Sequence, residues 1–230
     1  MTAISGHRGA AGILPENTLK GFRHAVSLGL EFTECDVQLS RDGHLVVMHD
    51  DTVDRTTNGS GRVADMALDD IRRLDAGDGE QVPTLAEVLE VVHGDTQLLC
   101  EMKGPGVEDA AMDAVAAAGM ENRVVFTSFH LERIEAVKQR NDRLRTRATF
   151  TTLTEDKIAR AVDLGACGVD VNYRNVCLRD VEQVLETGMD LVAWNPDDPA
   201  GYRAMLALGV PIISTNRPDL LLDYLQANGA

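Results

Sequence analysis

The side chains best suited to chemistry in this chain lie where short apolar runs end. They include two histidines, three carboxylates and two cations, and in chain order they are His7, Arg8, Glu34, Asp36, His49, Glu101 and Lys103. Each lies at or near the end of a predicted strand. We therefore predict that these residues form one reaction centre.

Spacing predicts how two pairs of these residues are oriented. Glu34 and Asp36 are two positions apart, as are Glu101 and Lys103. Alternate residues of a strand point to the same side, so both members of each pair should face one way. The residues between or beside them, Cys35, Cys100 and Met102, should then pack on the apolar face.

Three converging carboxylates require a cation, because they cannot all stay ionised in a pocket without one. Glu34, Asp36 and Glu101 offer hard oxygen ligands, which suit one divalent cation, either Mg²⁺ or Ca²⁺. Together with Arg8 and Lys103, such an ion would leave a small positive balance, which matches a singly charged phosphodiester. The competing interpretation is a salt bridge between Glu101 and Lys103, with the other two carboxylates in solvent.

His7 and His49 are the predicted acid and base. The imidazole pKa of about 6.5 allows one histidine to accept a proton and the other to donate one near neutral pH. Arg8 is expected to grip a phosphoryl group, and Lys103 to stabilise the charge on its oxygens. The remaining histidines are expected to be packed or surface residues.

Two further residues are weaker candidates for substrate binding. Glu16 follows Pro15 at the start of the first predicted helix and is expected to add a carboxylate to the site. Asn17 and Thr18 are expected to serve the helix start instead. Trp194, the only tryptophan, ends a predicted strand and is expected to form a wall against the carbon skeleton of the substrate.

Predicted strands and helices alternate along the chain. The strands are expected near 3–6, 31–37, 97–103, 123–128, 143–149, 167–172, 190–194 and 210–214. Helical patterns are expected over 17–28, 84–92, 107–118, 131–139, 155–164, 178–187, 199–208 and 219–226. Strands that each precede a helix are typical of a (β/α)8 TIM barrel, so 1–230 is predicted to be a single domain.

One region interrupts this alternation. The Arg41-Asp42-Gly43 turn is expected to form a hairpin, which places an extra strand at 44–48. Residues 50–83 then form a long connection with one short helix near 68–74, directly after His49. Long connections inside compact domains are usually functional or disordered. We interpret 50–83 as a small cap insertion.

Composition limits the partners of the chain. The formal net charge of −15 argues against nucleic acid and against stable association with an anionic membrane. No signal peptide or membrane-spanning stretch is apparent, and four cysteines without CxxC spacing suggest a reduced, cytoplasmic protein. The sequence leaves the oligomeric state open.

The chain resembles the glycerophosphodiester phosphodiesterases of the PLC-like phosphodiesterase superfamily over nearly its whole length. The matching segments are His7-Arg8-Gly9, Pro15-Glu16-Asn17-Thr18, Glu34-x-Asp36-Val37, His49-Asp50, Asp54-Arg55-Thr56-Thr57-Asn58-Gly59, Pro83-Thr84-Leu85, Glu101-x-Lys103 and Trp194. One departure is Asn216, where the family commonly has aspartate.

The resemblance implies a TIM barrel with a small insertion between the second strand and second helix. It also implies metal-dependent hydrolysis of small glycerophosphodiesters to glycerol 3-phosphate and an alcohol. The implied metal ligands are Glu34, Asp36 and Glu101. His7 and His49 would be acid and base, and the glycerol 2-hydroxyl would attack to form a cyclic phosphate.

Three alternatives compete with this interpretation. A lysophospholipase D-type enzyme for lipid diesters would need an apolar or basic approach to the membrane, which is not visible in 50–83. A non-catalytic phosphodiester-binding barrel would be favoured by loss of a histidine or a metal carboxylate, and none is lost. A Schiff-base aldolase would need a desolvated Lys103, but Glu101 on the same face favours the charged form.

Overall fold

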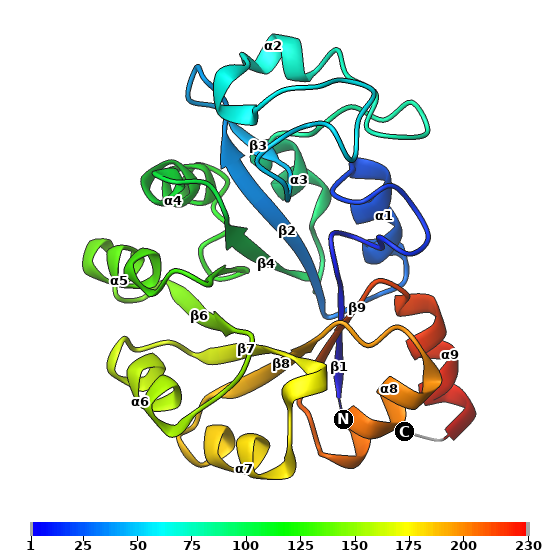
Figure 1. The fold of residues 1–230 in the computed structure, drawn as a ribbon, viewed down its shortest axis with the longest axis vertical. Helices are drawn as coiled ribbons and strands as arrows, with labels where there is room; N and C mark the ends of the chain where they lie inside the picture. Colours follow the sequence, from blue (N-terminus) through cyan, green and yellow to red (C-terminus); the bar gives the residue numbers. More distant parts are fainter. Residues whose placement is uncertain (1, 229–230) are drawn as a thin grey trace.

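A closed barrel of parallel strands forms the centre of the computed structural model, which describes residues 2–228 (Figure 1). Strand β1 pairs with both β2 and β9, which closes the barrel. In barrel order the strands are β1 (Ala3–Gly6), β2 (Phe32–Leu39), β4 (Gln97–Met102), β5 (Val124–Ser128), β6 (Arg145–Phe150), β7 (Gly168–Asn172), β8 (Asp190–Trp194) and β9 (Ile212–Thr215). The predicted TIM barrel is confirmed.

Helices surround the strands on the outside (Figure 1). They are α1 (Leu19–Ser27), α3 (Leu85–Val91), α4 (Val107–Ala117), α5 (Leu131–Arg140), α6 (Glu155–Asp163), α7 (Leu178–Glu186), α8 (Pro199–Ala207) and α9 (Pro218–Asn228). Side chains of Thr18, Thr84, Thr154 and Asp198 accept hydrogen bonds from the first turns of four of them, which explains where these helices begin. Within 2–228, no helix combines the length and apolar character needed to cross a membrane.

On five strands, β2, β4, β5, β8 and β9, an apolar layer inside the barrel lies below a layer that is mostly polar. The apolar layer packs as one cluster that consists of Phe32, Leu99, Val125, Val192 and Ile212. Two positions further along the same strands come Glu34, Glu101, Thr127, Trp194 and Ser214. Because alternate residues share a face, the polar groups stand directly above this layer, at the carboxyl ends of the strands.

The predicted hairpin is present after β2. Strand β3 (Leu45–Val47) pairs antiparallel with β2, and the chain then continues through η1 (Val63–Asp65) and α2 (Leu68–Ile71). This part lies at one edge of the barrel, at the top of Figure 1. It packs around its own buried cluster, made of Val46, Met48, Val53, Val63, Ile71, Ala76 and Val82. A role for 50–83 as a cap stays a prediction.

Candidate active site

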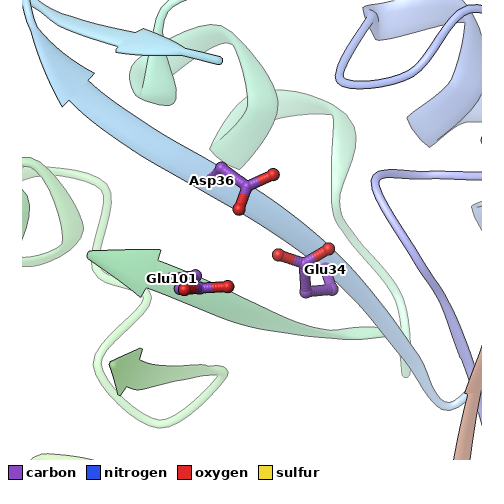
Figure 2. Close-up of side chains that lie close together, drawn as sticks. All are labelled: Glu34, Asp36 and Glu101. Carbon is purple, nitrogen blue, oxygen red and sulfur yellow. The ribbon is translucent and has the colours of Figure 1, made fainter. Parts of the chain in front are cut away.

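Three carboxylates meet between two neighbouring strands. Asp36 on β2 lies in register with Glu101 on β4, and Glu34 lies one inward-facing position earlier. Figure 2 shows the three side chains directed toward the space between these strands. Each offers a ligand oxygen within 4.8 Å of the others. The alternation predicted for these strands is confirmed, because Cys35, Cys100 and Met102 are buried in the core on the opposite face.

The electrostatics of this cluster favour a positive ion. Burial, and then the charges of Asp36 and Glu101, raise the pKa of Glu34 well above its usual value. Burial and the Asp36 charge raise the pKa of Glu101 to about 7. Glu34 Oε1 and Asp36 Oδ1 are buried without a hydrogen-bond partner. A hard divalent cation would satisfy these oxygens, so the donor set fits Mg²⁺ or Ca²⁺.

Two cations flank the carboxylates. The Nε atom of Arg8 lies 3.3 Å from Asp36 Oδ2, and its backbone N–H donates to Glu34 Oε2 at 2.9 Å. Lys103 Nζ lies 3.1 Å from Glu101 Oε1 and 3.9 Å from Asp36 Oδ1. The salt bridge between Glu101 and Lys103 in the competing interpretation is therefore present. The same interpretation placed Glu34 and Asp36 in solvent, but these residues are only 8% and 1% exposed.

His7 follows β1 and borders the cluster. Its Nε2 atom lies 3.8 Å from Glu34 Oε2, and its Nδ1 atom lies 2.7 Å from Asn216 Oδ1. The amide of Asn216 donates through Nδ2 to Asp197 Oδ2 at 2.7 Å, which leaves its oxygen for His7. This network assigns the proton to Nδ1 and leaves Nε2 as an acceptor. Burial and the charge of Arg8 lower the pKa of His7 to about 4.

His49 follows β3 and has a charged partner instead. Its Nδ1 atom lies 2.6 Å from Asp50 Oδ1, and Arg55 Nε donates to Asp50 Oδ2 at 2.6 Å. The hydrogen bond from Arg55 holds the pKa of Asp50 below its ordinary value. The imidazole of His49 is thus held by a carboxylate that is itself fixed by an arginine.

A cavity of about 240 Å³ opens at the carboxyl ends of the strands. Most of the predicted site residues line it, namely His7, Arg8, Glu34, His49, Glu101, Lys103 and Trp194. The ring of Phe129 packs edge-on against Trp194, with the ring centroids 5.9 Å apart, and also lines the cavity. This aromatic pair forms an apolar wall beside the charged groups.

Two predicted residues do not line this cavity. Asp36 is 1% exposed, and Asn17 Nδ2 donates to its Oδ2 atom at 2.9 Å. Glu16 lines a smaller neighbouring hollow, and its carboxylate accepts from both Arg8 and Arg55 at 2.8 Å. Burial raises the pKa of Glu16, but these two arginines outweigh it and lower the pKa to about 2.

Several residues that hold the site were not among the sequence candidates. Asn17 was expected only at the helix start, but it also holds a buried carboxylate. Asp197 had no signal in the sequence, because it reaches His7 only through Asn216. Asp50 and Arg55 hold His49 in a similar way, and Thr149 and Asp170 line the cavity.

Comparison with known proteins gives a consistent result. Residues 7–220 match the model of the glycerophosphoryl diester phosphodiesterase family. A glycerophosphodiester phosphodiesterase of Caldanaerobacter subterraneus subsp. tengcongensis is 35% identical, with 99% of each chain covered. The enzyme of that name from Bacillus subtilis is 31% identical over 93% of this chain and 83% of its own.

Solved structures agree with these relatives. The crystal structure of a glycerophosphodiester phosphodiesterase from Agrobacterium tumefaciens has a TM-score of 0.85 at 30% identity and covers 96% of this chain and 99% of its own. An Oleispira antarctica phosphodiesterase, solved in complex with its product sn-glycerol 3-phosphate, has a TM-score of 0.90 at 24% identity, with 98% and 97% covered. The chain belongs to the glycerophosphoryl diester phosphodiesterase family and is a phosphoric diester hydrolase.

Proposed function

We propose that this enzyme releases glycerol 3-phosphate and an alcohol from small glycerophosphodiesters by histidine acid–base catalysis at a divalent-cation site. The observation that carries the proposal is the pair of histidines on one cavity, beside three carboxylates of which two have an unpartnered oxygen. Glu34, Asp36 and Glu101 would hold one Mg²⁺ or Ca²⁺ ion. When bound, the ion would neutralise phosphoryl oxygens and make a nearby hydroxyl more acidic.

His7 is the proposed base. It is neutral near pH 7 because its pKa is about 4, and Nε2 is the nitrogen free to accept a proton. The glycerol 2-hydroxyl gives its proton to this nitrogen and attacks phosphorus, which forms a cyclic phosphate. Asn216 and Asp197 act as positioning residues, because they hold the His7 tautomer.

His49 is the proposed acid. It donates a proton to the oxygen of the departing alcohol, and the Asp50 carboxylate balances the positive charge of its proton-carrying form. Arg8 and Lys103 border the same cavity and would bind the phosphoryl oxygens. Water then opens the cyclic phosphate with the two histidines in reversed roles. Trp194 would cover the carbon skeleton of the substrate.

The test of this proposal is a coupled assay for glycerol 3-phosphate release from glycerophosphocholine and glycerophosphoethanolamine. We expect His7→Ala and His49→Ala each to lower kcat by about 10²-fold or more. The exposed His130 provides the control variant His130→Ala, which should keep the native rate. Undiminished turnover after complete chelation by EDTA would contradict the cation site.

A second substrate separates the two roles. The 4-nitrophenyl ester of glycerol 3-phosphate has a leaving group that needs little protonation. The loss caused by His49→Ala should therefore shrink to about tenfold or less, while that caused by His7→Ala should persist. If this substrate instead restored the activity of His7→Ala and not that of His49→Ala, His7 would be the acid and His49 the base.

We also propose a cytoplasmic location. Cys35, Cys100, Cys167 and Cys177 are all free thiols, which is typical of a reducing compartment. Subcellular fractionation tests this location, and recovery of the enzyme outside the cytoplasm would contradict it.

A further inference from the structure

The β6–β7 wall of the cavity carries a second polar pair. Thr149 on β6 and Asp170 on β7 are paired in register, and both line the cavity. The two residues are 5% and 6% exposed, so both are buried. Neither belongs to the group of carboxylates that is close enough to share an ion.

The Asp170 carboxylate is held in place by an arginine. Arg147 Nε donates to Asp170 Oδ1 at 2.5 Å, and the same guanidinium also pairs with Asp190. Gly168 makes room for this arrangement, because a Cβ atom there would collide with Arg147 and Asp190. Since Arg147 uses one carboxylate oxygen, the remaining acceptor capacity of Asp170 is available to a ligand in the cavity.

Thr149 differs from Asp170, because its buried hydroxyl makes no hydrogen bond. Its Oγ1 atom has no hydrogen-bond partner. Leaving a buried polar group without a partner costs stability, so such a group requires an explanation. Trp194 Nε1 and Asn195 Nδ2, from residues that line the same cavity, are also buried donors without partners. A polar ligand in the cavity would supply the missing partners.

We propose that Thr149 and Asp170 form a hydroxyl-binding subsite, which holds a hydroxyl group of the diester. The inference rests on the proposed function for the identity of the ligand. A hydroxyl donates to the Asp170 carboxylate and accepts from Thr149, whereas a quaternary ammonium group does neither. An anionic group would be repelled by Asp170, and the charge balance from Arg147 weakens the attraction of a cation.

The hydroxyl has two sources in such substrates, namely the terminal carbon of the glycerol half or the departing alcohol. Titration with sn-glycerol 3-phosphate in the presence of Mg²⁺ gives a Kd that reports on the glycerol half without turnover. KM values for glycerophosphoglycerol and glycerophosphocholine then examine the alcohol, because only the first carries hydroxyls on that side.

The informative variant is Thr149→Val, which removes the hydroxyl and keeps the shape. Asp170→Asn is less suitable, because it deprives the buried Arg147 of a counter-charge. The matched control is Thr146→Val, because Thr146 is also on β6, is also buried with an unpartnered hydroxyl, and does not line the cavity. Thr149→Ser should restore the native behaviour.

We expect Thr149→Val to weaken glycerol 3-phosphate binding by roughly three- to tenfold, the range for one hydrogen bond between uncharged groups. Binding of 1-deoxyglycerol 3-phosphate, which lacks the terminal hydroxyl, should then be unaffected by the substitution. An unchanged Kd with a raised KM for glycerophosphoglycerol alone would place the departing alcohol at the subsite.

Unchanged Kd and KM values in Thr149→Val, or equal changes in Thr146→Val, would overturn the subsite. Failure of the wild-type enzyme to release glycerol 3-phosphate would instead contradict the proposed function. The titration still decides the subsite in that case, because it does not depend on turnover.

Discussion

Two groups of acidic residues face the interior of this barrel, and they differ in their partners. On the β2–β4 side, Glu34, Asp36 and Glu101 crowd together and leave two oxygens without hydrogen bonds. On the β6–β8 side, Asp170 and Asp190 are bound by one fully buried arginine, Arg147.

The difference separates carboxylate oxygens that lack a partner from carboxylates that an arginine already holds. Crowded carboxylates with unpartnered oxygens gain stability from an added cation. Carboxylates that already share a guanidinium gain little, and they hold the neighbouring strands and side chains in place. Burial of acidic residues is therefore a poor guide to function until their partners are known.

Glu101→Gln should produce the largest effect on activity. It removes a proposed cation ligand, and we expect kcat/KM to fall by about 10³-fold, since such an ion contributes several kcal/mol to the reaction. Without added metal at pH 8, stability should stay the same or rise, because like charges are relieved. Activity assays and urea unfolding measure both quantities.

The control for this variant is Glu132→Gln, which makes the same change at an exposed position. It should alter neither activity nor stability. If Glu101→Gln lost stability along with activity, the β2–β4 cluster would stabilise the fold in the same way as Asp170 and Asp190 with Arg147.

Arg147→Met should lower stability, in contrast to Glu101→Gln. The substitution leaves Asp170 and Asp190 without their shared partner, and we expect the free energy of unfolding to fall by about 3–5 kcal/mol. Asp190→Asn provides a graded comparison. Because the Asp190 side chain is 38% exposed, its loss should cost about 1 kcal/mol or less. Urea unfolding that gives Arg147→Met the native stability would remove the distinction between the two clusters.

The smallest expected effect is on the rise in Tm caused by added metal, which should depend on pH. The pKa of Glu101 is raised from 4.5 to about 7, so the metal-free native state binds more protons than the unfolded chain between these values. Its contribution to stability is therefore complete at low pH and is lost as pH rises through 7. His7, with a pKa of about 4, stays neutral at both pH 5 and pH 8.

Saturating Mg²⁺ or Ca²⁺ should consequently raise Tm by about 5 °C or more at pH 8 and by less at pH 5, where protons compete for the ligands. Differential scanning calorimetry of the wild-type enzyme and Glu101→Gln measures this difference. An equal rise in both proteins would show that the ion binds elsewhere.

The sequence predicted the fold closely because its periodic signals are local. Strands such as Ala3–Gly6 and Asp190–Trp194 match the predicted ranges, and the hairpin at Leu45–Val47 follows from its turn residues. These features depend on alternation, helix starts and turns, which neighbouring residues decide. The expected helix at 68–74 is shorter, ending at Ile71.

The site was only partly predictable, because contacts between distant segments decide the partners. Glu16 illustrates this, since its place at the helix start suggested a ligand contact, whereas Arg8 and Arg55 use its carboxylate. Asp197 illustrates the reverse, since its effect passes through Asn216 to a histidine at the other end of the chain.

The sequence by itself determined which residues face the barrel interior, because alternation along a strand needs only the strand. It therefore predicted that the candidate carboxylates, histidines and cations would gather in one place, and most of them line one cavity. It also predicted the family to which the chain belongs. Only the tertiary structure decided which of the buried acids have a partner. Arg147 reaches Asp190 across β7, at a separation of 43 residues, and no local pattern encodes that contact. This pairing gives Asp170 and Asp190 a counter-charge, whereas two oxygens of the β2–β4 cluster have no partner.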